Sequence, residues 1–334
     1  MKELTAAISL IYSMPFSRIV SLKEEKVFLV STKGERYVLK LLPYPVAECR
    51  FITDAMDYLG HSGFHNYNEI IPTAAGRPCG EFRGYRTLLT KELKGRVPSY
   101  KKKDDLRAVA VCLGELHNAA TGFFPIHRFD PRNRWGTWLD TMTQSRAELA
   151  ELKEYASSKE SKTDFDRAYL EHCEGFIDEI EEAITGLMPF YPRFCDEKHR
   201  LGGFCHHDPA YHNFLIDHKG RAGVFDFDYV IADSAAHDAA ALVLKTAKAN
   251  HWDITAAHTA LRAYFEVAPM TQEERKLIYW LMRYPYDFHH AAFARYRENN
   301  EQRRIEKKLF RQIRDGERRE TFLGELKTML WEGT

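Results

Sequence analysis

The feature that most limits the fold of this chain is a short polar segment enclosed by apolar runs in its second half. Residues 204–216 read FCHHDPAYHNFLI, and residues 224–229 read VFDFDY. The turn-forming residues 218–220 between the two runs predict a hairpin, which brings both groups of polar side chains to one place. Several carboxylates held together without a cation would repel one another, so the segment favours a cation-binding site.

The order of the polar residues is typical of phosphoryl transfer. Asn213 follows Asp208 by five positions, and Asp226 stands at the end of the predicted hairpin strand. In such chemistry one carboxylate orients the acceptor hydroxyl and takes its proton, while an amide oxygen and another carboxylate hold Mg²⁺ against the phosphates. Lys40, on a predicted strand, is a candidate phosphate-binding cation, and Glu48 is a candidate partner for it.

Hydrophobic periodicity divides the chain into two parts. In residues 1–93, runs at 26–30 and 36–42 predict a hairpin, residues 46–59 a helix, and residues 85–93 a further strand. From residue 101 onward the spacing is helical, apart from the polar segment. We therefore expect an α+β fold with two lobes: a small antiparallel β-sheet lobe with one helix over residues 1–93, and a larger, mainly helical lobe over residues 94–334.

Composition excludes several classes of protein. Lys and Arg number 48 and Asp and Glu also number 48, so the chain lacks the overall positive charge of a non-specific nucleic-acid binder. No run approaches 18 apolar residues, which argues against a membrane span. The 6 cysteines are scattered without a CxxC pair, which favours reduced thiols in a cytosolic protein.

The segments 205–213 and 224–229 resemble those of the aminoglycoside phosphotransferase/choline kinase-like superfamily, and most closely the CotS family of bacterial spore coat proteins. Similar stretches at 93–96, 135–138, 165–166 and 284–288 extend the resemblance over nearly the whole chain. The resemblance implies a protein kinase-like fold and an ATP- and Mg²⁺-dependent transfer of phosphate to a hydroxyl of a small molecule. It also implies the mother-cell cytoplasm and then the spore coat as location, with other coat proteins as partners.

The resemblance also implies a role for each candidate residue. Asp208 matches the catalytic base. Asn213 and Asp226 match the magnesium ligands, and Asp228 matches an acidic position that some relatives use near the metal. The remaining matches concern the nucleotide: Lys40 and Glu48 correspond to an ion pair that orients the phosphates, and the adenine is expected against the backbone from Lys91 to Leu93.

One departure from the family pattern supports a second function. Kinase-like folds cover the phosphates with a glycine-containing loop, but residues 18–27 contain no glycine. Lys23 and Lys26 offer compensating charge, whereas Glu24 and Glu25 between them repel phosphate. The alternative is therefore a kinase-shaped structural protein of the spore coat with weak catalysis or none.

The candidate residues also have simpler interpretations. Lysine is common at exposed strand edges, and an acid at a helix start favours the helix dipole, so Lys40 and Glu48 have ordinary explanations, with Asp54 or Asp57 as other partners for the lysine. A zinc-dependent hydrolase built on His206, His207 and His212 is a third hypothesis, although their spacing fits no HExxH pattern.

Overall fold

The structure is a computed structural model that describes residues 2–23, 26–125 and 131–332. The chain forms two compact units, and each is assembled from separate stretches of sequence. Unit 1 consists of Met1–Asn133, Leu201–Ala235 and Ala263–Ala268; unit 2 consists of Arg134–Arg200, Ala236–Arg262 and Pro269–Thr334.

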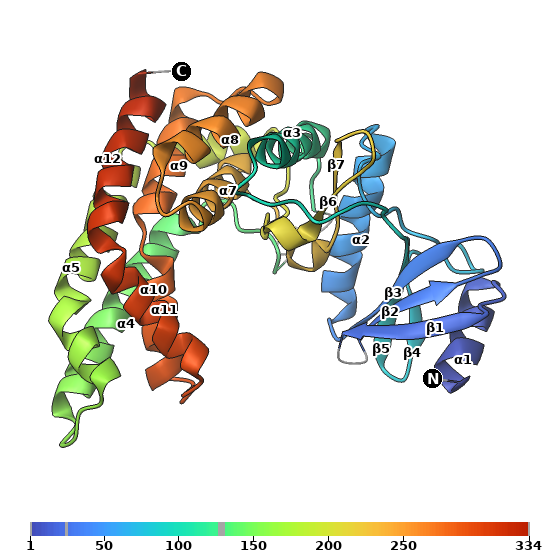
Figure 1. Ribbon diagram of the computed structural model, residues 1–334, viewed down its shortest axis with the longest axis horizontal. Helices are drawn as coiled ribbons and strands as arrows, with labels where there is room; N and C mark the ends of the chain where they lie inside the picture. The colour runs from blue at the N-terminus through green and yellow to red at the C-terminus, as the bar shows by residue number, and fades with distance from the viewer. Residues whose placement is uncertain (1, 24–25, 126–130, 333–334) are drawn as a thin grey trace. The chain divides into compact units, whose positions relative to one another are not determined.

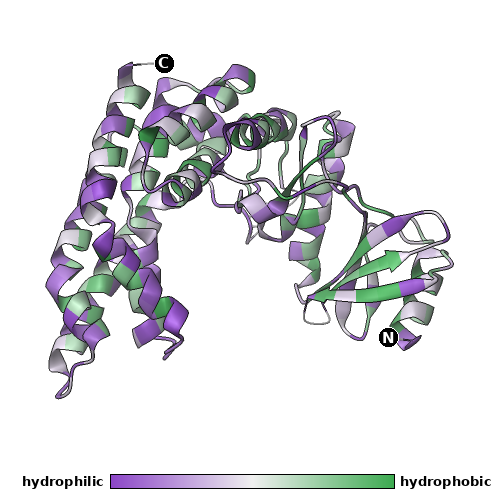
Figure 2. Ribbon diagram, in the orientation of Figure 1, coloured by the Kyte–Doolittle hydropathy of each residue, from purple (hydrophilic) through white to green (hydrophobic). Residues whose placement is uncertain are grey.

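Unit 1 contains a five-stranded antiparallel sheet with the strand order β1-β2-β3-β5-β4 (Figure 1). The strands are β1 (Arg18–Lys23), β2 (Val27–Ser31), β3 (Arg36–Leu42), β4 (Gly80–Phe82) and β5 (Tyr85–Lys91). In β2 and β3 the residues Phe28, Val30 and Leu39 are buried on one face of the sheet. These apolar strands appear green in Figure 2. The alternation of buried and exposed residues is what a sheet covered on one face requires.

Two helices accompany the sheet in unit 1, α1 (Lys2–Tyr12) and α2 (Val46–His61). Leu4, Ile8 and Tyr12 recur every four residues on α1 and join the same buried cluster as Phe28. The hydroxyl of Tyr12 donates a hydrogen bond of 2.7 Å to the carbonyl of Thr87, which fixes α1 against β5. The predicted hairpin and the helix from residue 46 are therefore present, with strand and helix bounds shifted by one or two residues. The expectation of one helix over residues 1–93 is corrected to two, because α1 also packs on the sheet.

The rest of unit 1 holds the polar segment. Helix α3 (Lys103–Ala120) packs against a two-stranded sheet made of β6 (Phe214–Ile216) and β7 (Ala222–Val224) (Figure 1). The N–H of Arg96 donates to the carbonyl of Ile216 at 3.0 Å, and the reverse bond measures 2.8 Å. The connection that leaves β5 is thus bonded to the predicted hairpin. Short 3₁₀ turns precede β6 (Tyr211–Asn213) and follow β7 (Phe227–Tyr229).

Unit 2 is helical. Its helices are α4 (Trp138–Ser158), α5 (Asp164–Leu187), α6 (Tyr191–His199), α7 (Ala235–Ala249), α8 (Ile254–Val267), α9 (Gln272–Arg283), α10 (Tyr286–Tyr296), α11 (Arg303–Arg314) and α12 (Gly316–Glu332), and the ends of α7 and α8 extend into unit 1. Stacked aromatic rings join α5 to α10, with 3.9 Å between the ring centroids of Phe176 and Phe288.

The predicted antiparallel sheet and the predominance of helix after it are both present. The expected division of the chain at residues 93 and 94 remains a prediction. In the described part of the chain no helix combines the length and the apolar character that a membrane crossing needs.

Candidate active site

The loop that precedes β6 is held by a buried histidine. The ring of His206 is inaccessible to solvent; its Nε2 lies 2.9 Å from the carbonyl oxygen of Phe225, and its Nδ1 accepts the N–H of Asp208 at 3.3 Å. Both ring nitrogens therefore contact backbone groups, and a metal ion would have to displace one of them. This arrangement makes His206 a brace between the two halves of the polar segment and gives no support to a zinc site built on it.

Asp208 and Asn213 are joined directly. The side-chain amide of Asn213 donates to the carbonyl and to the carboxylate of Asp208, each at 2.9 Å. Asn213 is buried, whereas Asp208 is half-buried. Because the amide nitrogen faces Asp208, the amide oxygen of Asn213 is directed away from it and can accept a hydrogen bond or bind a cation. The N–H of Phe225 donates to the carbonyl of Asn213 at 3.0 Å, which brings Asn213 beside the residue preceding Asp226.

A lysine from the N-terminal sheet reaches the two acids that follow β7. The ammonium of Lys40 on β3 forms ion pairs with Asp226 and with Asp228, the latter at 2.8 Å. The lysine side chain is 13% exposed, and those of the two acids are 36% and 22% exposed. Asp226 adopts the left-handed conformation, with φ of 72°, a strained state for residues other than glycine. The backbone thus turns sharply where the carboxylates converge on Lys40.

The electrostatics of this group favour a charged lysine. Burial by itself lowers the pKa of Lys40, but the negative charges of Asp228 and Asp226 outweigh it, so the pKa lies above its ordinary value. A protonated lysine is the counter-ion that allows two neighbouring carboxylates to remain ionised in a poorly solvated place. The position between Asp226 and Asp228 is therefore one that attracts a cation.

Glu48 has a partner that the sequence did not indicate. Its carboxylate lies 2.9 Å from the guanidinium of Arg132, which also donates to the carbonyl of Asp228 at 2.8 Å and to that of Val230 at 3.1 Å. The expected pairing of Lys40 with Glu48 is therefore not the arrangement in this structure. Arg132 connects the first turn of α2 with the loop that carries the acids.

No sequence signal identified Arg132 beforehand. It lies in a loop without hydrophobic periodicity, close to residues 126–130, which are outside the described residues. Its rigid fork of N–H groups directs one nitrogen to a carboxylate and the other to two carbonyls, a spread that the single nitrogen of a lysine does not offer. Only the folded arrangement brings these acceptors together.

Lys91 and Leu93 lie at the end of β5. The backbone N–H of Lys91 donates to the carbonyl of Glu69 at 2.9 Å, and its exposed ammonium contacts the Glu69 carboxylate at 2.6 Å. The side chain of Leu93 lies beside Gly223 on β7, where a Cβ on the glycine would stand 3.5 Å from Leu93 Cδ1. Leu93 therefore borders the hairpin, whereas Lys91 contacts Glu69, and in the described residues neither forms a hydrogen bond or ion pair with Lys40 or Asp208.

The segment expected over the phosphates is the antiparallel pair β1 and β2. Its pairing is irregular between Ser21 and Lys23, and the side chain of Leu22 is 57% exposed. Glu24 and Glu25, the two acids expected to repel phosphate, lie outside the described residues. An exposed leucine on this strand is compatible with a surface that covers a bound molecule.

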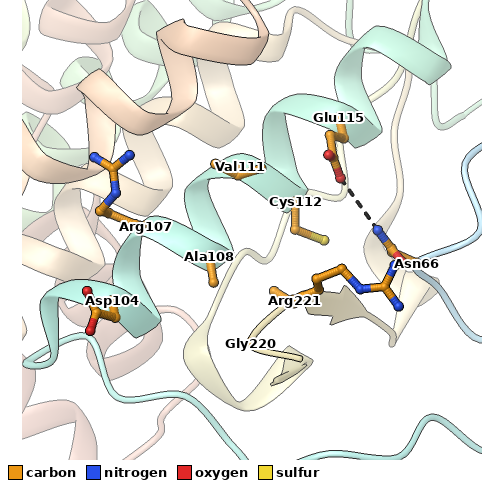
Figure 3. Close-up of a pocket in the computed structure, with 10 residues that line it drawn as sticks. Asn66, Asp104, Arg107, Ala108, Val111, Cys112, Glu115, Gly220 and Arg221 are labelled. Carbon is orange, nitrogen blue, oxygen red and sulfur yellow. Dashed lines mark hydrogen bonds between the residues drawn. The ribbon is translucent and has the colours of Figure 1, made fainter. Parts of the chain in front are cut away.

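A cavity of about 280 Å³ lies between α3 and the turn of the β6–β7 hairpin (Figure 3). Ala108, Val111 and Cys112 of α3 line it, and Asn66 donates to Glu115 at 3.5 Å on one side. Its lining contains none of the predicted site residues. The converging charged groups, and not this cavity, therefore form the candidate active site.

The structure brings five of the predicted residues together in two groups, and leaves Lys91 and Leu93 outside them. Lys40, Asp226 and Asp228 form the first group, and Asp208 with Asn213 the second. Glu48 is connected to the first group through Arg132. The arrangement offers oxygen ligands for a hard divalent cation, a nearby ammonium, and a half-buried carboxylate suited to accept a proton.

Comparison with known proteins adds a family match. A sequence model described as the phosphotransferase enzyme family matches residues 16–278. Spore coat protein S of Bacillus subtilis (strain 168) is 23% identical over 265 residues, which cover 79% of this chain and 75% of that protein. The family match includes both parts of the polar segment and the strand that carries Lys40.

Solved structures with the same fold include aminoglycoside and spectinomycin phosphotransferases. The aminoglycoside phosphotransferase of Alicyclobacillus acidocaldarius superimposes with a TM-score of 0.85 at 19% identity, covering 98% of this chain and 96% of that one. Spectinomycin phosphotransferase in complex with ADP and spectinomycin has a TM-score of 0.68 at 11% identity, with 93% and 94% covered. The expected kinase-like fold and the similarity to the spore coat family are thereby confirmed.

Proposed function

We propose, from the premise that the chain belongs to the phosphotransferase enzyme family, that it transfers the terminal phosphoryl group of ATP to a hydroxyl of a small molecule. The observation that supports this most is the convergence of Lys40, Asp226 and Asp228, with Asp208 and Asn213 beside them. An ammonium and several oxygen donors at one place are what a nucleotide–metal complex requires.

The donor chemistry fits Mg²⁺. Asp226, Asp228 and Asn213 offer two carboxylates and an amide oxygen, and hard cations prefer oxygen ligands. The ammonium of Lys40 between the two acids marks a position where positive charge is stabilised. When bound, Mg²⁺ would neutralise charge on the phosphates; this chain would supply its ligands from the end of β7 and from the turn before β6.

Each side chain then has a separate task. Asp208 would align the acceptor hydroxyl and take its proton as the new oxygen–phosphorus bond forms and the bond to the nucleotide breaks. The amide of Asn213 holds that carboxylate in place at 2.9 Å. Lys40 would steady the phosphates, and the backbone between Lys91 and Leu93 would receive the adenine. Catalysis would rest on positioning and charge neutralisation.

Arg132 would act as a positioning residue. It contacts the carboxylate of Glu48 and the carbonyls of Asp228 and Val230, so it fixes the loop that would bear the metal ligands. Glu48, in this proposal, contributes through Arg132.

The experiment for the catalytic base compares Asp208→Asn with the wild type. Transfer from radiolabelled ATP is measured across a panel of hydroxyl compounds that includes aminoglycosides, choline and sugars. We expect Asp208→Asn to reduce transfer at least about 100-fold, in line with the usual contribution of a general base, while Asp57→Asn, at an exposed acid on α2, retains full activity. Unchanged transfer by Asp208→Asn would contradict the assignment of the base.

Two observations favour a second candidate, a structural coat protein with weak catalysis or none: the absence of glycine from residues 18–27 and the similarity to Spore coat protein S. In either case we infer a location in the spore coat, with other coat proteins as partners. A ligand that binds only the native state raises the midpoint of thermal unfolding. No change in midpoint at millimolar ATP with Mg²⁺ would favour the structural candidate.

A further inference from the structure

Most of the exposed residues of α11 in unit 2 are basic, and the two others, Glu306 and Phe310, lie to one side of them. At 3.6 residues per turn the exposed basic residues of this helix fall within about 100° of arc, and every position inside that arc is basic. We call this set the basic stripe: Arg303, Arg304, Lys307, Arg311 and Arg314. The opposite side of the helix, with Ile305 and Leu309, is buried. Purple bands along α11 mark its hydrophilic residues (Figure 2).

The outward face of α5, in the same unit, carries the opposite charge. Between residues 171 and 182 its exposed acids also fall within about 100° of arc. We call them the acidic stripe: Glu171, Glu174, Asp178, Glu181 and Glu182. A further exposed acid, Asp164 in the first turn, pairs with Arg167 and is not part of this set. Each stripe has five charges of one sign, although Lys and Arg balance Asp and Glu over the whole chain at 48 each. The charge is therefore segregated by position and is not a general property of the surface.

A solvated helix face does not account for these stripes. Exposed helices usually gain stability from opposite charges four residues apart, and like charges at that spacing destabilise them. Lys307 has like neighbours at that spacing on both sides, Arg303 and Arg311, and Asp178 has them in Glu174 and Glu182. On α5 this repulsion is partly relieved within the chain, because Lys153, Arg146 and Arg283 pair with three of the acids. On α11 it is left for an oppositely charged partner to relieve.

The two stripes match in spacing when one is read backwards. Counting forward from Arg303, the other bases of the basic stripe lie 1, 4, 8 and 11 residues away, at positions 304, 307, 311 and 314. Counting backward from Glu182, the other acids of the acidic stripe lie the same 1, 4, 8 and 11 residues away, at positions 181, 178, 174 and 171. Two antiparallel helices would place these charges at equal heights over about 16 Å. Lys307 would then face Asp178 near the centre.

The charges needed for such docking are accessible. In the described residues, Arg303, Arg304, Lys307 and Arg311 form no ion pair, and neither do Glu171 and Asp178. Arg314 pairs with its neighbour Asp315, and Glu182 pairs with the buried Arg283, which also contacts Glu320. Glu174 and Glu181 pair with Lys153 and Arg146, but both acids remain 63% and 50% exposed. Exposed ion pairs of this kind contribute little, so a partner's arginine can replace them at small cost.

We propose that the basic stripe of one copy docks antiparallel on the acidic stripe of a second copy of this chain. The two stripes are opposite in sign, equal in length and reversed in spacing. The molecule therefore carries both halves of a complementary contact, which identifies a second copy as the partner. Phe310, 39% exposed at the edge of the basic stripe, would add an apolar contact. Because the contact is mainly between exposed charges, the association is sensitive to salt. It does not depend on the proposed enzymatic function.

Sedimentation velocity of the full chain tests this proposal. At about 0.02 M salt, where the Debye length exceeds about 20 Å, we expect a weight-average mass above that of the monomer at high micromolar protein. At about 0.5 M salt, where screening is nearly complete over that distance, the mass should return to that of the monomer. A wild-type protein that stays monomeric at low salt would overturn the proposal. The same holds if the monomer binds anionic lipid vesicles or nucleic acid instead.

Charge reversal gives the decisive version of this experiment. Lys307→Glu with Arg311→Glu removes attraction at one stripe, and Glu171→Lys with Asp178→Lys removes it at the other. Each double variant alone should be monomeric at low salt, whereas their equimolar mixture should associate, because each then offers a complementary stripe to the other. Association of either variant alone, or a mixture that stays monomeric, would contradict the proposed pairing.

A control separates this effect from a change of net charge or of folding. Lys101→Glu with Lys103→Glu, at exposed positions in unit 1, changes net charge as much as the α11 variant does. This control should associate like the wild type. Thermal unfolding of all variants at high salt, where the stripes are screened, verifies that each one folds.

Discussion

At the scale of single residues, the pairing of Lys40 carries most of the proposed chemistry. Its ammonium contacts both Asp226 and Asp228, so one cation from β3 balances two acids on the loop after β7. The same position suits the divalent cation that the phosphotransferase family would use. Lys40 therefore stabilises the site in the absence of nucleotide and would bind phosphate in its presence.

Replacing Lys40 by methionine tests this balance. The two acids would then be close and unpaired, so we expect the free energy of unfolding at pH 7 to fall by about 2–3 kcal/mol, the usual penalty for removing one partner of a buried pair. Millimolar Mg²⁺ without nucleotide should restore part of the loss, because it replaces the missing positive charge. Urea unfolding with and without Mg²⁺ measures both effects, and the wild type should respond less to the ion.

A second prediction compares the loss of Arg132 with the loss of Glu48 in their effects on stability. Arg132→Gln removes an ion pair and two hydrogen bonds to carbonyls, and we expect it to lower the free energy of unfolding by about 2–4 kcal/mol. Glu48→Gln leaves the carbonyl bonds intact and should cost about 1 kcal/mol or less. Urea midpoints distinguish the two. Equal effects of both variants would mean that the loop does not depend on Arg132.

At the scale of secondary-structure elements, the helices and strands that the sequence predicted are those set by the local pattern of apolar residues. The strands near 26–30 and 36–42, the helix from 46 and the hairpin at 214–224 follow from alternation and helical spacing. The partner of Glu48 could not be predicted in this way, because Arg132 is 84 positions away (132 minus 48) and lies in a loop without periodicity. Pairing of long side chains is decided by distances that only the packed structure sets.

The start of α5 illustrates an element whose stability depends on pH. Burial alone raises the pKa of Asp166, but hydrogen bonds from Lys159, Thr163 and Tyr296 outweigh it and lower the pKa to about 2 from its ordinary 3.8. The same carboxylate completes a capping box with Thr163. Because the pKa is lower in the folded state, its stabilisation is fully present above pH 3.8 and is lost as the pH falls through about 2.

The effect of Asp166→Asn on the free energy of unfolding should therefore be larger above about pH 4 than at about pH 2. At pH 7 we expect it to lower the free energy of unfolding by about 1–3 kcal/mol, because a buried hydrogen-bonded charge is lost. The difference from the wild type should shrink as the pH falls from about 4 to about 2. Chemical unfolding at several pH values measures it. Asp164→Asn, at an exposed acid in the same turn, should show no comparable pH dependence.

At the scale of the whole molecule, the two proposed properties belong to separate units. The candidate active site lies entirely within unit 1, and the two charged stripes lie entirely within unit 2. A protein of this kind can combine phosphoryl transfer with self-association, or retain only the second. The similarity to Spore coat protein S is compatible with either outcome, so nucleotide binding decides whether the site is functional.

The most direct measurement is calorimetric titration of ATP into the wild type and into Asp226→Asn, with Mg²⁺ and with EDTA. Asparagine tolerates the left-handed backbone of position 226, so the variant removes the charge and keeps the turn. We predict that the wild type binds ATP with Mg²⁺ at least about 10-fold more tightly than with EDTA, a difference of about 1.4 kcal/mol, and that Asp226→Asn loses this difference. Absence of ATP binding by the wild type, or an equal Mg²⁺ effect in both proteins, would contradict the assignment of the site.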